Sequence, residues 1–213
     1  MNLLSTLTIG DPWYAQYTVP WMRRYASRCG ADFLEIRQRH RYTADASWPG
    51  WAKLDALARF ARQTAYEQLM VIDADCVILP HCPDLFAQAE SRIRAVPDMG
   101  TPAVDARYME WCRHFLGAAP RHDQYFNSGM ILIDREAARA LLPHLVGPYP
   151  DEPYWDQDFL NFRVQEAFEV DFLPVSFNWL APQFEEAARA QNIVHFVGRY
   201  KSLIPGFCEN IIE

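Results

Sequence analysis

Two aspartates, Asp73 and Asp75, follow the unbroken apolar run of residues 69–72. Such a run predicts a strand that is buried on both faces, in the middle of a parallel sheet, and we expect it to extend over residues 69–77. Because side chains alternate along a strand, both carboxylates should lie on one side and repel each other. A divalent cation held by both would remove that repulsion, and carboxylate oxygen is a ligand that Mg²⁺ and Mn²⁺ prefer. The alternative is that one aspartate caps a turn while the other is solvated.

The pattern around this run alternates between strands and helices, which predicts an α/β fold with a mostly parallel central sheet flanked by helices. We expect strands over residues 3–9, 31–36, 69–77, 130–133 and 170–175, and helices over residues 13–29, 51–66, 135–142 and 156–168. Asp134 should cap the third of these helices. Ligands of such sheets bind beyond the carboxyl ends of the strands, where Asp73 and Asp75 are expected. We expect a single domain over residues 1–213.

The composition excludes several classes of protein. Half of the 213 residues are hydrophobic, which excludes disorder, and the net charge of −7 argues against a nucleic-acid binder. The five cysteines show no paired spacing typical of metal sites, which favours a reduced protein. No apolar run approaches the roughly 20 residues needed to span a bilayer, and no signal peptide is recognisable. We therefore expect a cytoplasmic protein, with peripheral association at the inner face of the membrane left open.

Further polar residues occur where predicted strands and helices begin. They are Asn127, Ser128 and Gly129 before a strand, Asp156, Gln157 and Asp158 at a helix start, and His195, Gly198 and Lys201 near the carboxyl end. Each has an ordinary structural explanation. One of the aspartates could cap its helix, the asparagine could stabilise a turn, and the histidine could be a half-buried strand residue.

The order of these segments resembles glycosyltransferase family 8 and its glycogenin-like relatives, which include bacterial lipopolysaccharide galactosyl- and glucosyltransferases. The motifs that carry the resemblance are Asp73-Ala74-Asp75, Phe126-Asn127-Ser128-Gly129, Asp156-Gln157-Asp158 and His195-Phe196-Val197-Gly198-Arg199-Tyr200-Lys201. The resemblance implies a GT-A fold and a nucleoside-diphosphate donor, UDP-glucose or UDP-galactose. It also implies bound Mn²⁺, with Mg²⁺ as the alternative, and transfer with retention at the anomeric carbon.

The resemblance also assigns roles to individual residues. It implies metal binding by Asp73, Asp75 and His195, and contact with the reacting sugar by Asp156, Gln157 and Asp158. It implies donor binding by Leu7, Thr8, Tyr14, Lys53, Asp73, Asn127, Ser128, Gly129, Gly198 and Lys201. The chain departs from the family at Ser202, where a proline is usual, and at Pro12, which looks like an insertion. It also lacks the basic, aromatic carboxyl-terminal extension of membrane-associated members, so the acceptor, whether glycan, lipid-linked or protein, stays open.

The chemistry agrees with these roles. The leaving nucleoside diphosphate carries several negative charges, which a divalent cation and lysine side chains would compensate. Lys201 is the first candidate, because Gly198 lets its loop pass close to a phosphate, and Lys53 is the second. One charge pair at about 4 Å is worth up to about 4 kcal/mol at an effective dielectric constant near 20.

Two other functions fit parts of the pattern. A sugar nucleotidyltransferase also places aspartates at the end of an α/β strand, but it would normally have a glycine-rich, basic loop after its first strand. Residues 7–14 contain only Gly10 and no lysine or arginine. A non-catalytic nucleotide-sugar binding protein is the other alternative. The full set of charged candidates argues against it, since buried charges are costly to keep without a use.

Overall fold

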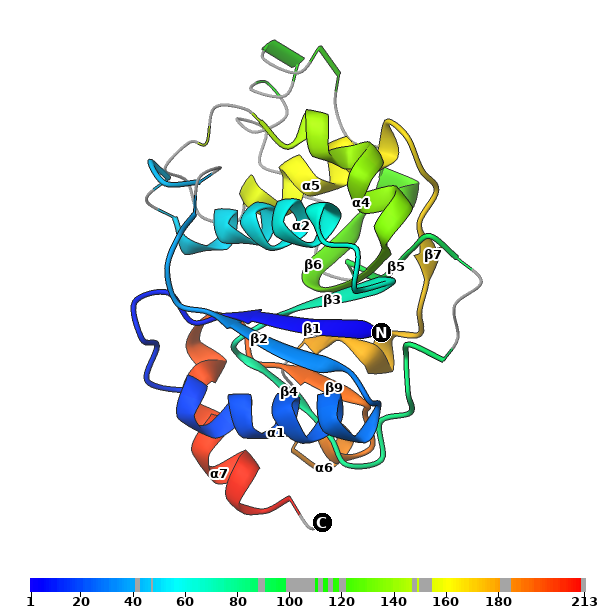
Figure 1. The fold of residues 1–213 in the computed structure, drawn as a ribbon. Helices are drawn as coiled ribbons and strands as arrows, with labels where there is room; N and C mark the ends of the chain where they lie inside the picture. The colour runs from blue at the N-terminus through cyan, green and yellow to red at the C-terminus, as the bar shows by residue number, and fades with distance from the viewer. Residues whose placement is uncertain are drawn as a thin grey trace.

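A six-stranded sheet forms the centre of the molecule (Figure 1). The computed structural model describes residues 1–40, 43–46, 48–87, 91–98, 110, 113–114, 117–118, 122–146, 149, 155–180 and 185–211. The strands, in their order across the sheet, are β2 (Asp32–Ile36), β1 (Asn2–Leu7), β3 (Gln68–Asp73), β6 (Phe126–Asp134), β5 (Ile93–Pro97) and β7 (Asp171–Phe172). Five of them run in one direction and β6 runs against them, so the predicted mostly parallel sheet is confirmed.

Helices and a second sheet cover the two faces of this sheet (Figure 1). One face carries α2 (Ala52–Arg62), α4 (Arg135–Leu141) and α5 (Trp155–Gln165). The other carries α1 (Ala15–Arg28) and a small sheet of β4 (Cys76–Ile78), β9 (Ile193–His195) and β8 (Trp179–Leu180), with α6 (Glu185–Arg189) and α7 (Ile204–Glu209) beside it. Short 3₁₀ helices are η1 (Pro49–Trp51), η3 (His122–Gln124), η4 (Leu142–His144), η5 (Val175–Phe177) and η6 (Gly198–Leu203).

The alternating side chains of β3 divide the core between these two layers. Leu69 and Val71 pack with α2, α4 and α5, whereas Met70 and Ile72 pack with α1 and β4. All four are buried, as the unbroken apolar run predicted. Because its side chains are packed on both faces, β3 has a fixed orientation, and the turn that follows it is positioned with it.

The predicted strand over residues 69–77 is wrong in its second half. β3 ends at Asp73, the chain turns at Ala74 and Asp75, and Cys76 starts β4 in the other sheet. The apolar residues after the turn are buried for a different reason, because β4 pairs with β9 and packs against α1. The turn therefore lies where the two sheets meet.

Other predictions near the site are confirmed. The strand expected over residues 130–133 is present and begins earlier, at Phe126. Asp134 caps α4, since its carboxylate accepts a hydrogen bond from the Ala137 N–H at 2.6 Å. One prediction is wrong over most of its length. The strand expected over residues 170–175 is reduced to the two residues of β7, because Pro174 leads into the 3₁₀ helix η5.

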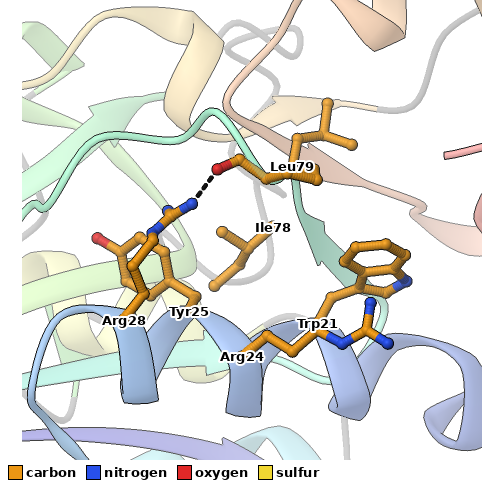
Figure 2. Close-up of a pocket in the computed structure, with 7 residues that line it drawn as sticks. Trp21, Arg24, Tyr25, Arg28, Ile78 and Leu79 are labelled. Carbon is orange, nitrogen blue, oxygen red and sulfur yellow. Dashed lines mark hydrogen bonds between the residues drawn. The ribbon is translucent and has the colours of Figure 1, made fainter. Parts of the chain in front are cut away.

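Helix α1 is fastened at both ends to the segment that contains this turn. Near its start, Thr18 Oγ1 donates to the carbonyl of Ala74 at 2.6 Å. Near its end, Arg28 donates to the carbonyl of Pro80 (Figure 2) and to that of Cys82. A pocket lies between α1 and residues 78–80, with Trp21 and Arg28 on its walls, and Figure 2 shows Arg28 reaching across it. Arg28 is thus engaged in holding the segment after β4 against α1.

Within the described ranges, every helix is too short or too polar to cross a lipid bilayer.

Candidate active site

The carboxylate of Asp73 lies on the α2 side of the sheet, at the carboxyl end of β3. Its position follows the alternation that directs Leu69 and Val71 to the same side. Both of its oxygens lie 3.0 Å from Lys53 Nζ. Lys53 stands in the first turn of α2, so this helix delivers an ammonium group to the end of the strand.

Asp75 directly precedes β4, so its neighbours come from the small three-stranded sheet. The Phe196 N–H donates to its backbone carbonyl at 2.9 Å, and β9 pairs with β4 so that His195 stands opposite Cys76. His195 Nε2 then lies 3.2 Å from Asp75 Oδ1 and 4.0 Å from Asp73 Oδ2. The two aspartates thus approach one imidazole nitrogen from opposite layers. The expectation that both carboxylates lie on one side of a single strand is wrong, because β3 ends at Asp73 and Asp75 lies in the turn to β4.

The distances from His195 Nε2 to the two carboxylates suit a small divalent cation. An octahedral ion with ligands at about 2.1 Å holds neighbouring ligand atoms about 3 Å apart and opposite ones about 4.2 Å apart. The separations of 3.2 and 4.0 Å around His195 Nε2 agree with those values. Two carboxylates and one imidazole are also a donor set that Mn²⁺ and Mg²⁺ accept. The ligand atoms of Asp75, Cys76 and His195, all three buried, lie within 4.8 Å of one another, and Asp73 is not part of that group.

Lys201 reaches the same carboxylate from η6. Its Nζ lies 3.0 Å from Asp75 Oδ2 and 5.2 Å from the ring centre of Tyr14. Burial by itself lowers the pKa of Lys201, but Asp75 raises it by more, so the group stays an ammonium. Burial likewise raises the pKa of Asp75, and the nearby His195 and Lys201 outweigh it, which leaves that carboxyl well below its usual range. Gly198 opens η6 with a φ of 56°, in the left-handed region.

Lys53 is the centre of a second, buried cluster. Only 4% of the residue is exposed, and its Nζ donates to Ser128 Oγ at 2.8 Å and lies 3.2 Å from Asp156 Oδ2, in addition to its contact with Asp73. Burial lowers the pKa of Lys53, but the carboxylates of Asp73 and Asp156 raise it by more, so it is held above its usual value. Lys53 is therefore a charged residue that ties α2, β3, β6 and α5 together.

Asp156 is placed by this lysine rather than by helix capping. It lies inside the first turn of α5, 3% exposed, and its other oxygen accepts from Trp48 Nε1 at 2.9 Å. Both carboxylate oxygens are therefore bound by side chains from other elements. This is the arrangement expected for a carboxylate with a fixed position.

Gln157 turns its amide into the protein. Its Oε1 accepts from the Ser128 N–H at 2.9 Å, while its Nε2 donates to Asp98 Oδ2 at 2.8 Å and contacts Tyr125 Oη at 3.2 Å. Tyr125 in turn donates to Asp158. The predicted contact of Gln157 and Asp158 with a sugar stays a prediction, and in this arrangement both side chains hold the start of β6 against α5.

The start of β6 supplies the predicted Asn127, Ser128 and Gly129. Asn127 Oδ1 accepts from the Gly129 N–H at 2.9 Å, so the asparagine folds over its own strand. A Cβ on Gly129 would lie 2.3 Å from His195 Cε1, closer than any real contact allows. Glycine is therefore required here because the imidazole passes directly over the backbone.

The three predicted residues near the amino terminus take different positions. Leu7 ends β1 in register with Asp73, which places its backbone at the same edge of the sheet. Tyr14 lies beside Lys201. Thr8 is buried, and its hydroxyl donates to Glu35 Oε1 at 2.9 Å. The structure thus gathers every predicted residue at one end of the sheet, with Thr8, Gln157 and Asp158 engaged in contacts of their own.

Sequence reasoning missed some residues that the structure places around the site. The Oδ1 of Asn178 lies 3.0 Å from His195 Nδ1, and Trp48 donates a hydrogen bond to Asp156. Asp98 and Tyr125 are hydrogen-bonded to Gln157, and Thr18 donates to the carbonyl of Ala74. None occurs in a recognisable motif. Asn178 and Asp98 each lie at a strand boundary, as polar residues of α/β sites often do, and this was the only signal available.

No family model matches the chain, and no curated protein matches it in sequence. Solved structures with the same fold are nevertheless found. A glycosyltransferase involved in the glycosylation of the major capsid of PBCV-1 matches with a TM-score of 0.65 and 12% identity, over 98% of both chains. The galactosyltransferase LgtC, solved with donor and acceptor sugar analogues, matches with a TM-score of 0.57 and 13% identity, over 100% of this chain and 97% of that one. Mouse xyloside xylosyltransferase 1 matches with a TM-score of 0.53 and 14% identity, over 93% and 97%.

These similarities establish the fold. The chain has the GT-A fold of these glycosyltransferases. The resemblance to family 8 that the sequence motifs indicated is confirmed at this level, since a member of that kind, LgtC, shares the arrangement over nearly its whole length.

Proposed function

We propose that this chain is a glycosyltransferase that moves a hexose from a nucleoside-diphosphate donor, UDP-glucose or UDP-galactose, to an acceptor with retention of anomeric configuration. One observation carries the proposal. Asp73 and Asp75 both approach His195 Nε2 at the carboxyl end of β3, at 4.0 and 3.2 Å, with Lys201 on Asp75 and the Lys53–Asp156 pair on Asp73. A site of this composition suits a donor that has a diphosphate at one end and a sugar at the other.

Asp73, Asp75 and His195 would hold the cation, for which we propose Mn²⁺ or Mg²⁺. When bound, the cation neutralises charge on the diphosphate as the bond to the sugar breaks. The charge of the site agrees with this role. The three carboxylates of Asp73, Asp75 and Asp156 outnumber the ammonium groups of Lys53 and Lys201 by one, so that the cluster attracts a cation before it meets an anionic donor.

Lys201 would bind the diphosphate directly. It is the more exposed of the two lysines, with 32% of its side chain accessible against 5% for Lys53. Its contact with Asp75 can be exchanged for a phosphate oxygen without burying a new charge. Lys53 would instead act through its partners, because it is buried and holds Asp73, Ser128 and Asp156 in place.

Asp156 would stabilise the reacting sugar. Positive charge develops at the anomeric carbon in the transition state, and a fixed, desolvated carboxylate stabilises it more than a mobile solvated one does. The bonds from Trp48 and Lys53 provide this fixation. Asn127, at the start of β6, would then meet a hydroxyl of the same sugar.

The experiment is a screen of nucleotide sugars by thermal unfolding, with and without Mn²⁺, followed by measurement of nucleoside-diphosphate release. A donor at 100 times its dissociation constant should add about 2.7 kcal/mol to the stability of the chain. We expect stabilisation by a UDP-hexose with Mn²⁺ and its loss in EDTA. Asp75→Ala should lose both the stabilisation and the turnover. Full turnover in EDTA, or wild-type turnover in Asp75→Ala, would show that the proposal is wrong.

A further inference from the structure

A buried asparagine outside every sequence motif connects the predicted metal ligand with the predicted sugar-binding segment. Asn178 lies between η5 and β8 and is 3% exposed. Its Oδ1 is 3.0 Å from His195 Nδ1, and its Nδ2 is 2.8 Å from Asn127 Oδ1. One amide thus contacts two residues that have different proposed roles.

These hydrogen bonds form a series that ends at the backbone N–H of Gly129, and this N–H determines the direction of each bond. The backbone N–H of Gly129 can only donate, so the atom of Asn127 that it meets at 2.9 Å must be the oxygen. That oxygen must then meet the NH₂ group of Asn178, and the opposite atom of Asn178 must be its oxygen. The oxygen accepts, so His195 Nδ1 must carry a hydrogen and donate it.

This order determines what His195 presents to the two aspartates. With one hydrogen fixed on Nδ1, Nε2 is the nitrogen whose lone pair can be offered toward Asp75 and Asp73, at 3.2 and 4.0 Å. A lone pair facing carboxylate oxygens is the arrangement that a shared cation stabilises. An imidazole in the other tautomer would turn an N–H toward the same point and could not act as a ligand.

The same order determines what Asn127 presents to a ligand. Its Oδ1 accepts two hydrogen bonds, from Gly129 and from Asn178, and is therefore saturated. Among the described residues, its Nδ2 has no hydrogen-bond acceptor within the protein. The asparagine accordingly has two donor hydrogens for a ligand and no free acceptor.

We propose that Asn178 is a positioning residue that holds His195 in its Nδ1–H tautomer and orients the amide of Asn127. The proposal rests on the proposed function insofar as His195 is taken to be a metal ligand. Partners of ligating histidines fix the ring and its tautomer, and their loss typically weakens metal binding about 10- to 100-fold. A purely structural asparagine would hold two loops together without any effect on the tautomer.

The experiment compares three variants with the wild-type chain. Asn178→Ala removes both contacts. Asn178→Asp keeps an acceptor for His195 Nδ1 but replaces the NH₂ group that faces Asn127. Asn192→Ala is the matched control, because Asn192 is a half-buried asparagine just before β9 whose amide donates to Ser176 Oγ at 3.1 Å, away from the site.

Two measurements are made on each protein. The ¹⁵N shifts of the imidazoles report the tautomer in the absence of metal, with the His195 signals identified by their loss in His195→Gln. Titration with Mn²⁺, followed by the electron paramagnetic resonance signal of the free ion, reports metal affinity without any need for turnover.

We expect the wild-type chain and Asn192→Ala to show the Nδ1–H form of His195 and equal Mn²⁺ affinity. Asn178→Ala should populate the Nε2–H form and bind Mn²⁺ about 10- to 100-fold more weakly, and Asn178→Asp should restore the tautomer and most of the affinity. An Nε2–H form in the wild type, or an unchanged tautomer in Asn178→Ala, would overturn the proposal. If Asn178→Ala does not fold, the wild-type and Asn178→Asp tautomers still decide it. Absence of Mn²⁺ binding in a wild type with the expected tautomer would overturn the proposed metal dependence and leave the role of Asn178 supported.

Discussion

Replacement of Asp156 with asparagine tests how a buried carboxylate is used in this site. The side chain of Asp156 is 4% exposed, with one oxygen 3.2 Å from Lys53 Nζ and the other accepting from Trp48 Nε1. Asparagine has nearly the same shape and can still accept from Trp48. The substitution therefore removes one negative charge while it leaves the packing intact.

The cost to stability follows from what Lys53 retains. Breaking a buried ion pair that has no other partner costs about 3–5 kcal/mol. Lys53 keeps Asp73 at 3.0 Å and Ser128 at 2.8 Å, so its charge is not left unpaired. We expect the loss of one hydrogen bond to a charged group, about 2 kcal/mol. For a chain of this size the unfolding temperature should fall by about 4–8 °C, which calorimetry would measure.

The loss of activity should be much larger than this change in stability suggests. If the carboxylate of Asp156 stabilises charge at the anomeric carbon, turnover at saturating donor should fall about 10²- to 10³-fold, with little change in donor affinity. The matched control is Asp134→Asn, at the far end of β6, where the aspartate is a helix cap. Asparagine caps equally well, so this variant should keep both stability and turnover. Turnover within a few-fold of wild type in Asp156→Asn would refute the role given to Asp156.

Three further outcomes are expected. Lys201→Ala should weaken binding of the nucleoside diphosphate in calorimetry but lower stability by less than about 1 kcal/mol, because its ion pair is partly exposed. Gly129→Ala should destabilise the fold by about 1–3 kcal/mol and weaken Mn²⁺ binding, since the added Cβ displaces His195; unchanged metal affinity would show that the imidazole is not the ligand. Burial raises the pKa of Cys82 to about 12 and holds that of Cys76 well above its usual value, so neither thiol should react with a thiol reagent at pH 8 until the chain is unfolded.

Much of the fold could be predicted because local signals agreed with the global arrangement. The apolar runs at residues 69–72 and 130–133 became the two central strands β3 and β6. The helix expected from residue 51 became α2, and Arg59 and Arg62 lie on its exposed side. Boundaries were less predictable, because the turn at Asp75 is produced by pairing with β9, which comes more than a hundred residues later.

The charged residues of the candidate site could be predicted from the sequence, whereas the residues that support them were missed. Charged residues are informative in a sequence because they are rarely buried without a partner, so Asp73, Asp75 and Lys53 could be proposed as a group. Asn178 gives no such signal, since an asparagine before a strand is ordinary loop chemistry. Its contact with His195 depends on η5 and β9 packing together, which no local pattern encodes.

The reversed direction of β6 is what completes the site. The sequence predicted a mostly parallel sheet, in which residues that precede a strand lie at the edge opposite to residues that follow one. On that basis Asn127 and Ser128, at the start of β6, would lie a full strand length away from Asp73, at the end of β3. In the structure β6 is antiparallel to β3, with Met130 paired to Ile72, so the start of one strand meets the end of the other. The antiparallel pairing is therefore the condition under which Ser128 can accept from Lys53 while Lys53 contacts Asp73, and it joins the proposed sugar-binding segment to the proposed metal ligands.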